Sequence, residues 1–149
     1  DSVIDENHLV EIIRKLKRPY VRYTRADEKN VRKADCLIID CFGLLSSIYR
    51  YGEIAYIGGG FGVGIHNTLE AAVYGIPVIF GPKYQKFQEA IQLLEAKGAF
   101  SVKDYEELKT LLDRMLTDEV FLRESGMNAS NYVTGNAGAT DKIMSMINF

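Results

Sequence analysis

The sequence predicts an α/β fold in which helices cover both faces of a parallel sheet. Three observations predict it. Short apolar runs alternate with helical patterns along the chain, and glycines close several of the helical patterns. The run "CLIID" (Cys36–Asp40) is continuously apolar up to its last residue, as expected for a strand that is buried on both faces. Alternating units of this length favour parallel strands joined by crossover helices.

The apolar runs and the helical patterns follow one another in a regular order. Strands are expected over residues 20–24, 36–40, 53–59, 77–81 and 99–102. Helices are expected over residues 8–18, 46–51, 67–75, 86–97, 103–116, 118–133 and 139–149. Apolar residues recur at helical spacing in the first and fifth of these helices, namely Leu9, Ile12, Ile13 and Leu16, and Leu108, Leu111, Leu112 and Met115. Each set is predicted to face a core.

The length is compatible with one folded domain over residues 1–149. The chain contains no low-complexity linker and no internal repeat. Because it opens on Asp-Ser-Val instead of a methionine, we expect a fragment of a longer protein. The apolar residues of the last helix then either pack on this domain or face a missing partner domain; they are Ile143, Met144, Met146, Ile147 and Phe149.

Composition and charge argue against several classes of function. Hydrophobic residues make up 47% and charged residues 26%, as in soluble domains, and no apolar run approaches the length of a membrane helix. The net charge of -2 gives no overall attraction for nucleic acid. The basic stretch from His8 to Lys33 either faces an anionic ligand or is a solvated surface. Two cysteines are too few for a disulfide framework, so reduced thiols are expected. The cysteines and histidines also lack the spacing of a metal site, so no metal is expected.

The segment Gly58–Pro82, "GGGFGVGIHNTLEAAVYGIPVIFGP", contains seven of the thirteen glycines of the chain. It begins where a parallel strand is expected to end, which is the sheet edge where open α/β sheets bind ligands. Glycine lets a ligand approach the backbone, and a helix that begins near Asn67 would offer amides without internal partners. The pattern therefore predicts an anion site, most naturally for a phosphate.

The spacing within this segment narrows the class of ligand. It contains neither a G-x-G-x-x-G fingerprint nor a Walker A motif, which argues against NAD binding and ATP hydrolysis. Glu70 lies one turn into the expected helix, where its carboxylate can accept hydrogen bonds from a sugar diol. One phosphate with a sugar is therefore favoured. The alternative is structural, with Asn67 and Glu70 as a capping box and the glycines as a tight turn.

The residues of this segment resemble those of a known family. The stretch "IGGGFGVGIHNTLEAAVYGIPVIFGPKYQKFQEA", with "DCFGLL" upstream, resembles the carboxyl-terminal domain of 3-deoxy-D-manno-octulosonic acid (Kdo) transferases. The resemblance runs from about Cys36 to the end of the chain and implies a Rossmann-like domain of a GT-B glycosyltransferase. It further implies transfer of Kdo from CMP-Kdo to a lipid A precursor in lipopolysaccharide biosynthesis, without a metal or another cofactor.

The resemblance also implies where this chemistry takes place. The site of action would be the cytoplasmic face of the bacterial inner membrane. A separate amino-terminal domain would bind the lipid acceptor and the membrane, and it would carry the general base. No catalytic residue is therefore expected in this chain, which would bind the donor but transfer nothing by itself.

Matched position by position, the resemblance implies a donor site built from loops that follow strands and from the first turns of helices. Its expected residues are Asp40, Gly43, Gly59, Gly60, Gly64, His66, Asn67, Glu70, Gly81, Pro82, Phe87 and Glu89. The glycines would shape the phosphate pocket, while His66 and Asn67 would reach the phosphate or the sugar carboxylate. Glu70 would hold the ribose, and Asp40 would lie beside the base or the ribose.

The chain departs from the family pattern at four positions. The family often has Ser where Gly60 stands, Pro where Thr68 stands, Glu where Leu44 stands and Asn where Lys86 stands. Two other classes of function stay open. One is a GT-B domain for a UDP- or GDP-sugar, which would need more donors for a second phosphate. The other is a nucleotide-binding or interaction module without catalysis.

Overall fold

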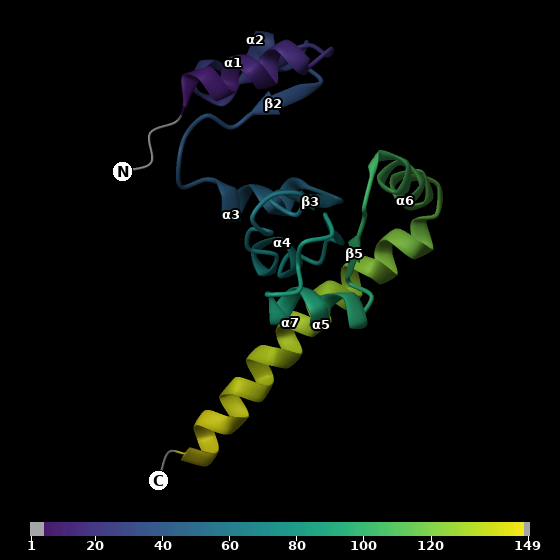
Figure 1. The fold of residues 1–149 in the computed structure, drawn as a ribbon. Coiled ribbons are helices and arrows are strands. Elements are labelled where there is room, and N and C mark those ends of the chain that lie inside the picture. Colours follow the sequence, from purple (N-terminus) through teal and green to yellow (C-terminus); the bar gives the residue numbers. More distant parts are fainter. Residues whose placement is uncertain (1–4, 148–149) are drawn as a thin grey trace. The chain divides into compact units, whose positions relative to one another are not determined.

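The chain divides into two compact units, Asp1–Leu45 and Ser46–Phe149, which we name the amino-terminal and the carboxyl-terminal unit. The computed structural model describes the backbone of residues 5–147 and the side chains of residues 5–136 (Figure 1). The single domain expected over residues 1–149 stays a prediction. None of the described helices combines the length and the apolar content needed to span a bilayer.

The amino-terminal unit is a small α/β arrangement with a two-stranded parallel sheet. Strand β1 (Tyr20–Arg22) pairs with β2 (Cys36–Ile38), with Val21 opposite Leu37. Before and between the strands lie α1 (Glu6–Lys15), the 3₁₀ helix η1 (Tyr23–Arg25) and α2 (Glu28–Val31). Helix α2 is not expected from the periodicity, because it is a single turn that depends on polar capping by Asp27 and Asn30.

Little apolar surface is buried in this unit. Among its described residues, Leu9 and Val21 are the buried apolar side chains. The expected inward stripe of α1 is wrong for Ile12, which is 41% exposed. The thiols of Cys36 and Cys41 are free and half-buried.

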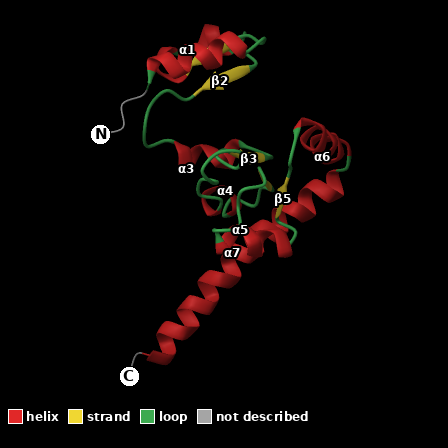
Figure 2. Ribbon diagram, in the orientation of Figure 1, coloured by secondary structure: helices red, strands yellow, loops and turns green. Residues whose placement is uncertain are grey.

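The carboxyl-terminal unit contains a three-stranded parallel sheet in the order β3-β4-β5. Strands β3 and β5 are labelled in Figure 2. Ala55 of β3 lies opposite Val78 of β4, and Val78 lies opposite Ala99 of β5. The elements from the unit boundary onward are α3 (Leu45–Ile48), η2 (Tyr49–Tyr51), β3 (Ala55–Ile57), α4 (Leu69–Ala72), β4 (Val78–Phe80), α5 (Gln88–Glu95), β5 (Ala99–Ser101), α6 (Tyr105–Thr117) and α7 (Glu119–Ile147).

The central strand β4 is buried on both faces, which confirms the expected layers. Val78 and Phe80 point into one core cluster, to which α4, α5 and α7 contribute. Ile79 points the other way, into a second cluster with Met115 of α6. Successive strand residues face opposite sides of a sheet, so the apolar run Val78–Phe80 is explained by helices on both faces. The burial on both faces expected for Cys36–Asp40 is wrong, because Leu37 of β2 is 45% exposed in a unit that has only a small described core.

Helix α7 is one continuous helix where two separate helices are expected from the sequence (Figure 1). Besides larger side chains such as Phe121 and Tyr132, glycine and alanine bring it close to the backbone of the unit. A Cβ added to Gly126 would contact the Gly75 carbonyl oxygen, and one added to Gly98 would lie 2.6 Å from the Ala129 backbone nitrogen. The sequence left open whether the apolar side chains near the end of the chain pack on this domain or face a partner. These side chains lie outside the described residues; they are Ile143, Met144, Met146, Ile147 and Phe149.

Candidate functional site

The candidate site consists of two loops that follow neighbouring strands of the carboxyl-terminal unit. The first, residues 58–68, follows β3, and the second, residues 81–87, follows β4 (Figure 2). Because β3 and β4 are parallel, both loops leave the same edge of the sheet, where α/β folds bind ligands. Most of the expected donor-binding residues lie on these loops or in the helical turns that follow.

The first loop folds back on itself through its own backbone. The amides of Gly62 and Gly64 donate to the Gly59 carbonyl at 3.0 and 3.1 Å, and the His66 amide donates to the Gly58 carbonyl at 3.1 Å. Gly59 has φ +92°, and a Cβ on it would contact the Gly64 carbonyl oxygen, so this position requires glycine. These three amides are therefore engaged within the loop, which the glycine pattern could not reveal.

The two loops contact each other through backbone atoms. A Cβ on Gly60 would lie 2.5 Å from the Gly81 nitrogen, and the Lys83 amide donates to the Gly60 carbonyl at 2.9 Å. The missing side chain at Gly60 thus allows close approach of the second loop, in addition to removing the hydroxyl that the family often has there. This contact gives the two loops one fixed shape.

The helix after the first loop is shorter than expected and begins later. We expected a helix over 67–75, but α4 spans Leu69–Ala72 and its N-cap is Thr68. The Asn67 Oδ1 accepts a hydrogen bond from the Leu69 amide at 2.9 Å, so the capping box, which was the structural alternative for Asn67 and Glu70, is wrong. Because four residues align few peptide dipoles, the helix attracts an anion less strongly than the sequence suggests.

Glu70 lies in the first turn of α4 and is half-buried. Within the described part of the chain its carboxylate forms no ion pair and no side-chain hydrogen bond. Its negative charge acts on Tyr49, where burial of the ring raises the pKa of the hydroxyl and the charge of Glu70 raises it further. His66 and Asn67, just before α4, are exposed. Glu70 is therefore a partly desolvated carboxylate available to a ligand beside the glycine loop.

A cavity of about 300 Å³, which we name the lysine cavity, opens between the two loops. It is lined by Gly62, Val63, Gly64, Lys83, Gln85, Lys86 and Phe87. Lys83 and Gln85 are missed by the sequence argument, which weighs Lys86 only as a departure from the family. The signal available was the pair of lysines in "GPKYQKF", directly after a strand. Phe87 also supports the first loop, since a Cβ on Gly64 would lie 3.1 Å from its ring.

Two of the expected residues, Asp40 and Gly43, belong to the amino-terminal unit. The Asp40 side chain has no exposed surface. Its Oδ2 accepts from Thr24 Oγ1 at 2.6 Å and from Arg22 Nε at 2.7 Å, while Oδ1 accepts from the Thr24 amide at 2.9 Å. Arg22 also binds Glu6 at 2.8 Å. The structure thus places Asp40 in a buried network; its contact with a nucleotide stays a prediction.

This network strongly favours the ionised form of Asp40. The hydrogen bonds from the Thr24 hydroxyl and amide, together with that from Arg22, lower the pKa of Asp40 to about 2. The hydrogen bond of Arg22 with Glu6 and, to a smaller extent, that with Asp40 raise the pKa of the Arg22 guanidinium. Gly43, three residues later, has φ +88°, with open space where a Cβ would point, so its glycine is explained by backbone conformation alone.

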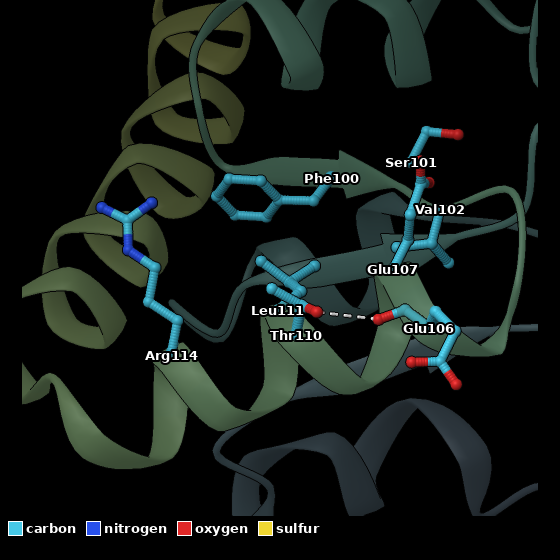
Figure 3. Close-up of a pocket in the computed structure, with 8 residues that line it drawn as sticks. All are labelled: Phe100, Ser101, Val102, Glu106, Glu107, Thr110, Leu111 and Arg114. Carbon is cyan, nitrogen blue, oxygen red and sulfur yellow. Dashed lines mark hydrogen bonds between the residues drawn. The ribbon is translucent and has the colours of Figure 1, made fainter.

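A second cavity, of about 500 Å³, lies between β5 and α6 of the carboxyl-terminal unit (Figure 3). Phe100 and Leu111 supply apolar surface, and Glu106 and Glu107 supply negative charge. The one cation in its lining, Arg114, has its guanidinium 3.6 Å from the centre of the Phe121 ring. An acidic lining of this kind disfavours a phosphate, so we assign the ligand site to the glycine loop.

A metal centre is also not apparent in the part of the chain that the structure describes. No group of three or more His, Cys, Asp or Glu side chains lies close enough together there to hold a metal ion.

Comparison with known proteins finds relatives that share one name. No protein-family model matches the sequence. The chain is 42% identical over 87 residues to the 3-deoxy-D-manno-octulosonic acid transferase of Aquifex aeolicus, covering 57% of this chain and 25% of that protein. It is 32% identical over 116 residues to the enzyme of the same name from Rickettsia bellii, covering 76% of this chain and 28% of that protein. The chain thus spans about a quarter of the length of these curated relatives.

A solved structure also has this fold. The crystal structure of the C-terminal CMP-Kdo binding domain of WaaA from Acinetobacter baumannii matches with a TM-score of 0.74, over 85% of this chain and 67% of that chain. At 19% identity this likeness bears on the fold alone. The sequence is thus similar to that of Kdo transferases, and its fold is that of a GT-B carboxyl-terminal domain.

Proposed function

We propose that this chain is the donor-binding domain of a glycosyltransferase that moves Kdo from CMP-Kdo to a lipid A precursor in lipopolysaccharide biosynthesis. The observation that carries the proposal is Glu70, a half-buried carboxylate without an ion-pair partner among the described residues, one turn after a glycine loop at the ligand-binding sheet edge. The names of the relatives, and that of the structural neighbour, support the choice of donor.

Each part of the site has a chemical task in this proposal. The Glu70 carboxylate accepts hydrogen bonds from the ribose hydroxyls, and such bonds to a charged acceptor are about twice as strong as neutral ones. His66 and Asn67 lie exposed between the loop and α4, where they donate to the phosphate. Because the amides of Gly62, Gly64 and His66 are engaged within the loop, the side chains carry more of this contact than the sequence suggests.

The same groups assist the transfer step. When the bond between Kdo and the phosphate breaks, negative charge grows on the departing CMP, and donors held in place at the phosphate stabilise that charge. The acceptor hydroxyl must also lose a proton to a general base. We place that base, the acceptor site and contact with the cytoplasmic face of the inner membrane in a further part of the enzyme. The 149-residue chain should therefore bind CMP and transfer no Kdo, and transfer by the purified chain would contradict this assignment.

Binding of CMP and of 2′-deoxy-CMP, measured by calorimetry, tests the role of Glu70. The unaltered chain should bind CMP about tenfold or more tightly than 2′-deoxy-CMP, because the deoxy ligand loses one charge-assisted hydrogen bond. In Glu70→Gln the two ligands should bind almost equally. Glu53→Gln is a matched control, because Glu53 is exposed and precedes β3, at the opposite end of the strand from the glycine loop.

The outcomes separate the remaining classes of function. Equal discrimination against the deoxy ligand in the unaltered chain and in Glu70→Gln would contradict the ribose assignment. Tighter binding of UDP or GDP than of CMP would favour another nucleotide-sugar donor. Failure of every nucleotide to bind would favour an interaction module and would overturn the proposed function.

A further inference from the structure

The lysine cavity carries positive charge that the proposed contacts of the nucleotide do not use. Both of its ionisable residues, Lys83 and Lys86, are lysines, and both are exposed. Within the described part of the chain neither lysine forms an ion pair. By contrast, Lys103 just before α6 pairs with Glu107 at 3.5 Å, and Lys109 on α6 pairs with Asp113 at 2.7 Å. The cavity therefore presents two uncompensated cations beside the glycine loop.

The backbone that carries these lysines is held in place at several points. The Lys83 amide donates to the Gly60 carbonyl at 2.9 Å. The side-chain amide of Gln85 is satisfied within the second loop, since Nε2 donates to the Pro82 carbonyl at 2.9 Å and Oε1 accepts from the Tyr84 amide at 3.1 Å. The Phe87 amide donates to the Tyr84 carbonyl at 2.9 Å. Gln85 thus fixes the loop and leaves the two lysines as the groups that can meet an anion.

An anion in this cavity would be bound by the lysine ammonium groups and not by the backbone amides of the glycine loop. Gly62 and Gly64 form its other side, and both of their amides donate to the Gly59 carbonyl. His66 and Asn67 are expected to reach the phosphate or the sugar carboxylate, and the proposed function assigns them to the phosphate; they follow Gly64 by two and three residues. The cavity is therefore close in sequence to the proposed phosphate contacts but offers a different kind of donor.

From these contacts we infer that the lysine cavity is a second anion subsite, which binds the carboxylate of the donor's sugar acid through Lys83 and Lys86. This inference rests on the proposed function. CMP-Kdo carries two anionic groups close together, the phosphate diester and the carboxylate on the anomeric carbon of Kdo. A subsite for the carboxylate distinguishes a sugar-acid donor from a neutral sugar on the same nucleotide. A second phosphate is the competing anion, and it would mark a nucleoside diphosphate donor.

Binding of CMP, CDP and CMP-Kdo to the unaltered chain and to the double variant Lys83→Met/Lys86→Met tests the inference. Methionine keeps much of the length of the lysine side chain and removes its charge. Loss of both cations should weaken CMP-Kdo binding about tenfold and change CMP or CDP binding less than twofold. The double variant Lys103→Met/Lys109→Met removes the same net charge from α6 and the residues just before it, and it should leave all three affinities within twofold.

Each other outcome overturns the inference in a distinguishable way. An equal loss for CMP and CMP-Kdo would mean that the lysines serve the nucleotide phosphate. A lysine-dependent affinity for CDP that equals or exceeds that for CMP-Kdo would assign the cavity to a second phosphate. Unchanged CMP-Kdo binding in the cavity variant would remove the lysines from the site. If the unaltered chain binds none of the three ligands, the proposed function itself fails, and the inference fails with it.

Discussion

Each of the two units of this chain is stabilised internally by a different kind of interaction. In the carboxyl-terminal unit β4 is buried on both faces, and α7 approaches to backbone distance at Gly126. In the amino-terminal unit the described apolar core is small, and a buried carboxylate, Asp40, is bound by Thr24 and Arg22. The comparison teaches that the stability of the amino-terminal unit should depend on pH. The stability of the carboxyl-terminal unit should depend on volume added to or removed from its core.

The largest expected effect is on the packing of α7. Gly126→Ala should lower the free energy of unfolding of the carboxyl-terminal unit by about 3 kcal/mol, because the new methyl group meets the rigid backbone of Gly75. Denaturant unfolding followed by circular dichroism measures this. Gly135 lies in the same helix, and a Cβ added there would have no neighbouring atom within 4 Å. Gly135→Ala should therefore raise the free energy of unfolding by up to about 1 kcal/mol. Equal effects at the two positions would show that α7 does not approach Gly75 closely.

The second prediction concerns acid and the amino-terminal unit. The pKa of Asp40 is lowered to about 2, so the stabilisation from its ionised form is complete above about pH 4 and is lost as the pH falls toward 2. An NMR titration of the Asp40 carboxyl carbon, with hydrogen exchange of the β1 amides, measures both effects. We expect the loss of protection to begin in this unit, since no charged side chain is buried among the described residues of the other unit.

Variants of the network separate its contributions. Thr24→Val removes the hydroxyl whose hydrogen bond contributes most to the lowered pKa of Asp40, so the titration should move back toward pH 4. Glu6→Gln removes a partner of Arg22 and leaves both Thr24 bonds in place, so the Asp40 titration should move much less. A larger shift in Glu6→Gln than in Thr24→Val would contradict this order.

The smallest expected effect is at Thr68, the N-cap of α4. Its Oγ1 is buried and has no hydrogen-bond partner among the described residues, so Thr68→Val should stabilise the carboxyl-terminal unit by about 1 kcal/mol. Thermal unfolding measures it. At Thr110 the hydroxyl donates to the Glu106 carbonyl at 2.9 Å on an exposed face, and Thr110→Val should change stability by less than about 0.5 kcal/mol. Destabilisation by Thr68→Val would reveal a partner for this hydroxyl.

The candidate site illustrates what sequence reasoning could reach. The order of strands and helices, and the place of the glycine loop after β3, follow from apolar periodicity, which depends on residues close together in the chain. The capping box was wrong because Asn67 bonds to Leu69 instead, and α4 begins two residues later than expected. The lysine cavity was missed because it depends on the contact of the Gly60 loop with the Gly81 loop, about twenty residues apart.

The sequence by itself determined the alternation of strands and helices and the position of the glycine loop. Both are properties of local pattern, and local pattern sets which face of an element is apolar. Only the tertiary structure decided that Asp40 lies in a buried network, that three loop amides are already engaged and that two lysines share a cavity. Each of these depends on atoms brought together from distant parts of a unit, and a hydrogen bond or an unpaired charge exists only once those atoms are in place.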